Sequence, residues 1–156
     1  MHQGGRVLEM TPRWYEIALE EKAVVEVPGP GSNPRIVEYL RGCGLPEDLA
    51  ARDETPWCGA FVAWCMQRAG VAVAQHPARA ASWLSWGAPS DRRVGAVIVL
   101  RTRQRSEMTT SGYHVGFYVA ADNGHVWVYG GNQGDQVKLS AFPLNRWEIV
   151  GVRWAS

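Results

Sequence analysis

Residues 114–130 read HVGFYVAADNGHVWVYG, and this stretch decides the fold class. Two segments with period-two patterning, 114–121 and 125–130, flank Asp122-Asn123-Gly124, a sequence typical of a β-hairpin turn. The second half of the chain therefore predicts an antiparallel sheet of about five strands. The other three strands are expected at residues 94–100, 136–139 and 149–154.

The first half of the chain has helical patterns instead. Asn33-Pro34 and Thr55-Pro56 each place a capping side chain before a proline, which favours a helix start. Helices that precede an antiparallel sheet are typical of an α+β fold. The helices are expected at about residues 12–21, 34–41, 56–69 and 78–86.

Length and composition limit the classes of protein that this chain can represent. A chain of 156 residues with 46% apolar and 20% charged residues predicts one globular domain, residues 1–156. A net charge of +1 gives no basic stripe for nucleic acid. The longest apolar run, 94–100, is far below the roughly 20 residues that span a bilayer, so no membrane insertion is expected.

Glutamates interrupt the region where the apolar core of a secretory signal would lie, at residues 9, 16, 20 and 21. We therefore expect synthesis in the cytoplasm without a signal peptide. If the target lies outside the cytoplasm, in the cell wall or periplasm, the protein must be released or delivered by other machinery.

Cys58 is the best candidate for a nucleophile among the cysteines at positions 43, 58 and 65. If Thr55 caps the helix and Pro56 is its first residue, Cys58 is the third. There, unpaired backbone N–H groups and the helix dipole favour a thiolate. The same N–H groups would be donors to an oxyanion. Cys43 and Cys65 are interpreted as small buried apolar residues.

A thiolate nucleophile needs a base, and the base needs an orienting group. His114 opens a predicted strand with the small Gly116 on the same face, which leaves room for a substrate. His125 lies at the other end of the hairpin, over about 20 Å away, and cannot share that site. A three-residue turn places Asn132 opposite His114, whereas a two-residue turn places Gln133 there. Asn132 is favoured, and Gln133 remains the alternative.

Three motifs, at residues 53–65, 113–118 and 130–133, together resemble the phage-associated branch of a known family. This family comprises the cysteine, histidine-dependent amidohydrolases/peptidases (CHAP), papain-like hydrolases that cut peptidoglycan. Residues 33–36 and 81–84 also fit, so the resemblance covers nearly the whole chain. One departure is Gly130, where many such enzymes have a glutamate two residues before the asparagine.

The resemblance implies a papain-like fold with Cys58 as nucleophile, His114 as base and Asn132 as orienting residue. It implies cleavage of the muramoyl–L-alanine amide or of a bond within the stem peptides, in endolysin-, tail- or effector-type lysis of the cell wall. An inactive wall-binding or virion structural module is the alternative from another class, and an acyltransferase is a third. No cofactor is expected, and an inhibitor or immunity protein is a candidate partner of an expected monomer.

Three further residues are predicted to contact the substrate: Trp57, Glu54 and Gln133. Trp57 has core packing as its alternative interpretation, and Glu54 has a solvated acidic loop. No metal site is expected, because the chain has neither an alternating Asp/Asn run for calcium nor a His-Glu-x-x-His pair for zinc.

Overall fold

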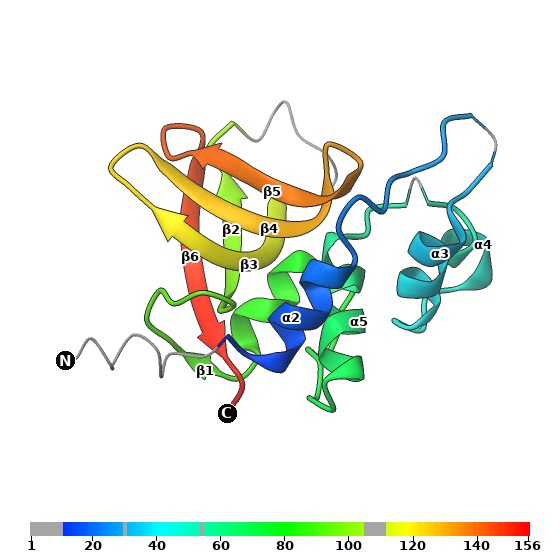
Figure 1. Ribbon diagram of the computed structural model, residues 1–156, viewed down its shortest axis with the longest axis horizontal. Helices are drawn as coiled ribbons and strands as arrows, with labels where there is room; N and C mark the ends of the chain where they lie inside the picture. Colours follow the sequence, from blue (N-terminus) through cyan, green and yellow to red (C-terminus); the bar gives the residue numbers. More distant parts are fainter. Residues whose placement is uncertain (1–10, 30, 54, 105–111) are drawn as a thin grey trace.

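The computed structural model describes residues 11–29, 31–53, 55–104 and 112–156, and within them the helices come first (Figure 1). The helices are α2 (Arg13–Glu20), α3 (Pro34–Arg41), α4 (Glu47–Ala50), α5 (Cys58–Arg68) and the 3-10 helix η1 (Ala80–Ser85). The strands are β1 (Ala88–Pro89), β2 (Val97–Thr102), β3 (Tyr113–Ala121), β4 (His125–Gln133), β5 (Gln136–Pro143) and β6 (Trp147–Trp154). The predicted α+β class is confirmed.

The described strands form one antiparallel sheet in the order β1-β6-β2-β3-β4-β5. The sheet curves strongly, and α2 and α5 lie together at one side of it (Figure 1). Five of the six strands correspond to the predicted ones. The sixth, β1, has only two residues, too few to show a period-two pattern in the sequence.

The β3–β4 hairpin turns more tightly than expected. The Asp122 N–H donates to the carbonyl of His125 at 3.0 Å, which closes a two-residue connection. A bulge at Val119 then adds one residue to β3, so that farther along Phe117 pairs with Tyr129. The shorter turn and the extra residue in β3 have opposite effects on the strand register. The pairing toward the start of β3 is therefore the one that a three-residue turn would give.

The two proline-associated helix starts differ. The Asn33 side chain accepts a 2.8 Å hydrogen bond from Arg35 N, as predicted for a helix cap. The Thr55 hydroxyl instead donates to the carbonyl of Leu49, and α5 begins two residues later than predicted. Cys58 is therefore the first residue of α5 rather than the third, which still leaves it in the first turn.

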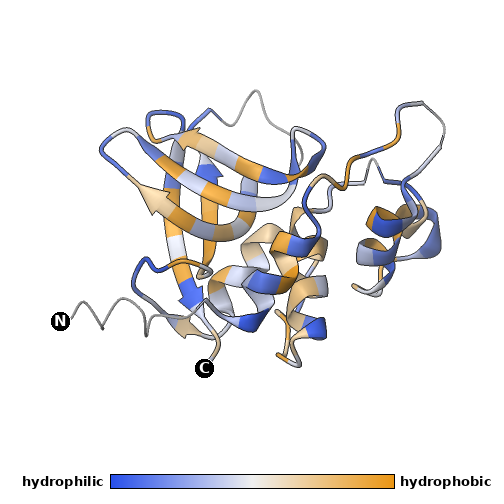
Figure 2. Cartoon of the chain, in the orientation of Figure 1, coloured by the Kyte–Doolittle hydropathy of each residue, from blue (hydrophilic) through white to orange (hydrophobic). Residues whose placement is uncertain are grey.

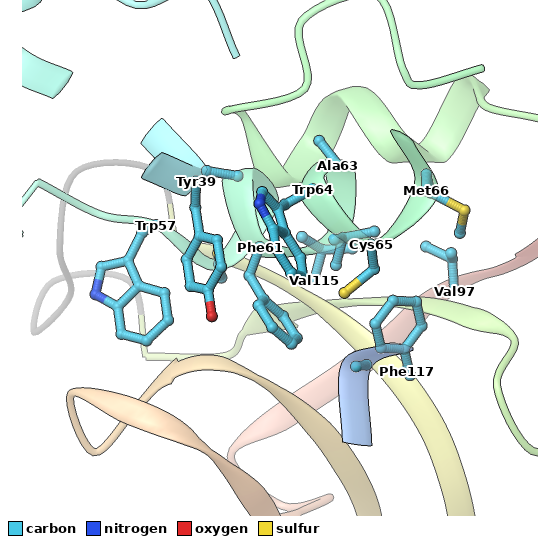
Figure 3. Packing of buried hydrophobic residues seen from close by; sticks show 14 of the residues in the cluster. Tyr39, Trp57, Phe61, Ala63, Trp64, Cys65, Met66, Val97, Val115 and Phe117 are labelled. Atoms are coloured by element: carbon cyan, nitrogen blue, oxygen red, sulfur yellow. The ribbon is translucent and has the colours of Figure 1, made fainter. Parts of the chain in front are cut away.

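Helix α5 is the central element of the larger hydrophobic core. It packs on β3 and β4 and is covered by α2 and α3. The Tyr39 ring of α3 lies against Phe61 and Trp64 of α5 and against Trp57 just before that helix, with centroids 5.2–5.8 Å apart (Figure 3). Apolar residues concentrate in α5 and the strands, whereas the connecting turns are hydrophilic (Figure 2). Among the described helices, none has the length and apolar character needed to cross a membrane.

Candidate active site

Cys58 lies where the start of α5 meets β3. Its thiol sulfur accepts hydrogen bonds from the backbone N–H groups of Gly59 and Val115. The first backbone hydrogen bond of α5 runs from Phe61 N to Trp57 O, so the N–H groups of residues 58–60 have no backbone carbonyl as partner within the helix. Polar backbone hydrogens therefore surround the sulfur, an environment that favours a thiolate and can hold a developing oxyanion.

His114, near the start of β3, is hydrogen-bonded to the Cys58 thiol through its imidazole. Its Nε2 lies 3.0 Å from Oε1 of Gln133. The Gln133 Nε2 already donates to the carbonyls of Val128 (3.0 Å) and Lys138 (2.8 Å), groups that only accept. Oε1 must therefore face the ring, and His114 Nε2 carries the proton that it accepts. The other ring nitrogen, Nδ1, is left for Cys58.

Cys58 and His114 shift each other's pKa values in opposite directions. Burial by itself raises the pKa of Cys58, but the charge of His114 and its hydrogen bond, with those from Val115 and Gly59, leave that pKa below its usual value. Burial lowers the pKa of His114, but the Cys58 thiolate and the bond to Gln133 leave it raised. These shifts favour a thiolate–imidazolium pair near neutral pH.

Aromatic side chains hold the imidazole from the other side. The Phe142 ring stacks on His114 with centroids 5.2 Å apart and an interplanar angle of 29°. Trp147 meets both rings, at 6.5 Å from His114 and 5.4 Å from Phe142. Sequence patterns did not identify either aromatic residue, because β5 and β6 reach the site only through the curvature of the sheet.

The structure corrects the predicted orienting residue: Gln133, and not Asn132, is bonded to His114. The pairing of β4 with β5 shifts by one residue between Gly130 and Gln133, and Asn132 adopts a left-handed conformation there with φ 59°. Since side chains alternate along a strand, one extra residue turns Gln133 onto the face of Gly130. Asn132 lines the cleft instead.

Two glycines make room for the Gln133 amide. A Cβ at Gly130 would lie 2.5 Å from Gln133 Oε1, and one at Gly116 would lie 3.5 Å from the same atom. Any larger side chain at position 130 would collide with Gln133. Gly130, which departs from the expected glutamate, is therefore required by the glutamine that occupies its space. From the sequence, this arrangement was predicted only as the alternative register, in which Gln133 lies opposite His114.

The other predicted substrate contacts also change. Trp57 is fully buried, and its Nε1 donates to Glu26 at 2.9 Å, so it does not form a wall of the cleft. A Cβ at Gly131 would lie 2.6 Å from the Trp57 ring, so this ring packs under the bulge that precedes Gln133. Gln133 lines the cleft, as predicted for a substrate contact, but it is only 4% exposed and already makes three hydrogen bonds. Glu54 lies outside the described residues.

A cleft of about 810 Å³ opens above Cys58 and His114. One wall comes from the segment that leads into η1, and the other comes from β5 and β6. Within the ranges that the structure describes, no group of three or more His, Cys, Asp or Glu side chains could hold a metal ion. The Cys58 thiol and the His114 imidazole both face this cleft.

The CHAP domain matches residues 50–132, more than half of the chain, and the match includes both Cys58 and His114. The chain belongs to the CHAP family. CHAP domains are generally amidohydrolases or peptidases that act on peptidoglycan, although inactive members exist, and the six-stranded α+β architecture is consistent with a papain-like CHAP fold. A comparison with curated proteins finds no match.

Proposed function

We propose that this CHAP protein is a cysteine amidase or endopeptidase that cleaves peptidoglycan through an acyl-enzyme. The observation that carries the proposal is the contact between Cys58, at the start of a helix, and His114, whose proton position is fixed by Gln133. A thiolate with an adjacent imidazolium and free backbone donors has the parts that acyl transfer needs. An inactive module would have no need for this polar arrangement beneath an open cleft.

In the acylation step, the Cys58 thiolate forms a bond with the carbonyl carbon of the amide. The carbonyl oxygen becomes an oxyanion, for which the N–H groups at the start of α5 are the available donors. The carbon–nitrogen bond breaks, and the leaving amine takes the proton from Nδ1 of His114. An S-acyl enzyme and a neutral imidazole remain.

In the deacylation step, water attacks the thioester carbonyl and gives a proton to His114. The carbon–sulfur bond then breaks, which releases a carboxylic acid and restores the thiolate–imidazolium pair. Gln133 keeps the ring in one tautomer throughout both steps, because Nε2–H donates to its oxygen before and after each proton transfer.

The proposed catalytic unit extends beyond the matched residues on both sides. Helices α2 and α3 pack on α5 in the same core, and Phe142 and Trp147 line the cleft from β5 and β6. We also propose membership in the phage-associated branch, supported by residues 33–36 outside the matched stretch, with action at the cell wall in lysis of the endolysin, tail or effector type.

The test is digestion of purified peptidoglycan followed by mass spectrometry of the released fragments. New amino termini on L-alanine would indicate the amidase reaction, and new termini within the peptides would indicate the endopeptidase reaction. Cys58→Ala and Cys58→Ser are expected to abolish release while thermal unfolding stays close to wild type. Undiminished digestion by purified Cys58→Ala would contradict the proposed nucleophile.

A further inference from the structure

Each wall of the cleft carries a cation that has no anionic partner among the described residues: Arg79 and Lys138. We propose that these two side chains bind a free carboxylate of the substrate beside the amide that Cys58 attacks. The proposal rests on the proposed function and specifies its substrate: a stem peptide with an unamidated acidic residue next to the cleaved bond.

The wall with Arg79 is attached to the nucleophile helix by close backbone packing. A Cβ at Gly59, the residue after Cys58, would lie 2.4 Å from the carbonyl oxygen of Pro77 and 3.0 Å from that of Ala78. Only glycine allows this approach, so the segment that carries Arg79 is held directly beside the reacting sulfur. Arg79 is exposed at the cleft, where its guanidinium can form a bidentate contact with a carboxylate.

The wall with Lys138 is attached to the base. The Lys138 carbonyl accepts a 2.8 Å hydrogen bond from Gln133, the same residue that is bonded to His114. The ammonium of Lys138 extends over Gly134, where a Cβ would lie 3.1 Å from Nζ. Gly134 and the half-buried Lys138 both line the cleft, so the ammonium lies within reach of a ligand bound there.

The charges of the lining residues favour an anionic ligand. Among the described residues that line the cleft there is no Asp or Glu, while Arg79 and Lys138 are both present. A thiolate–imidazolium pair at Cys58 and His114 contributes no net charge, so the two cations remain uncompensated. Amines of a stem peptide are thus the poorer fit, and carboxylates the better one.

Peptidoglycan offers a matched pair of ligands for a test. A second stem residue linked through its γ-carboxyl retains an α-group, which is a carboxylate in D-isoglutamate and a neutral carboxamide in D-isoglutamine. These groups have nearly the same shape and differ by one charge. A charge-assisted contact should therefore distinguish two otherwise identical muropeptides.

The experiment measures binding of both muropeptides to Cys58→Ala by calorimetry and their hydrolysis by the wild type. We expect about tenfold tighter binding of the carboxylate form, about 1.4 kcal/mol, and a smaller preference at high salt. Arg79→Gln and Lys138→Gln should each reduce the preference. Arg92→Gln and Lys22→Gln, which replace cations outside the cleft lining, are the matched controls and should preserve it.

Binding and hydrolysis separate the two proposals. Equal affinity for both muropeptides, or no binding of either, would overturn the carboxylate site even if the wild type cleaves both. A preference that persists in Arg79→Gln and Lys138→Gln would also overturn it. If Cys58→Ala prefers the carboxylate form and both Arg79→Gln and Lys138→Gln lose this preference, the carboxylate site is supported. This holds even if the wild type cleaves neither muropeptide, a result that would contradict only the proposed reaction.

Discussion

Replacing Gln133 by alanine separates the role of this glutamine from that of its neighbour Asn132. The variant removes the acceptor that faces His114 and the donor that serves the carbonyls of Val128 and Lys138. Three hydrogen bonds at about 0.5–1.5 kcal/mol each predict a loss of about 1.5–4.5 kcal/mol in the free energy of unfolding. The imidazole remains beside Cys58 but loses its fixed tautomer.

Turnover of Gln133→Ala should fall by about ten- to a hundredfold, because orientation is lost but the base remains. His114→Ala removes the base itself and should cost about 10²–10⁴-fold. Gln133→Glu can still accept from His114, but it cannot donate to the two carbonyls, so it should lose stability and raise the pKa of His114 further. The assay combines turnover on purified peptidoglycan with denaturant unfolding of each variant.

Asn132→Ala and Asn132→Gly are the matched controls, because Asn132 lines the same cleft and has no bond to the imidazole among the described contacts. Asn132→Gly should also tolerate the φ of 59° without strain. Both should keep turnover within about threefold of wild type, well under the 1.4 kcal/mol that a tenfold change represents. A loss of turnover in Asn132→Ala close to that in His114→Ala, with Gln133→Ala near wild type, would show that Gln133 is not the orienting residue.

Three further predictions concern thiol reactivity, metals and the aromatic support of the base. Iodoacetamide at pH 6 should label Cys58 first, because the pKa of its thiol is lowered and labelling fades only below that pKa. Burial raises the pKa of Cys43 to about 11 and also raises that of Cys65, so both should react slowly. Equal labelling rates in the intact protein would contradict an activated thiolate. Activity should survive EDTA, and loss on chelation with recovery on calcium would indicate a metal requirement. Phe142→Leu removes the ring stacked on His114 and should lower kcat more than it raises KM, with an altered pH profile; an unchanged profile and kcat would exclude this positioning role.

Much of the architecture follows from local sequence. The Asn33-Pro34 pair predicted the start of α3, and alternating apolar residues predicted five of the strands, because both signals depend on neighbours a few residues apart. The pairing of Cys58 with His114 was predicted from the need of a thiolate for a base and from the family resemblance, although α5 begins two residues later than predicted. In the folded protein the His114 imidazole is hydrogen-bonded to the Cys58 thiol.

Long-range packing decided the rest. At the bulge that exchanges Asn132 for Gln133, the Trp57 ring fills the space where a Cβ of Gly131 would lie, and glycines at 116 and 130 leave room for the Gln133 amide. Neither condition can be seen in a window of neighbouring residues. A one-residue slip reverses every side chain beyond it, so the identity of the orienting residue was set by the tertiary structure.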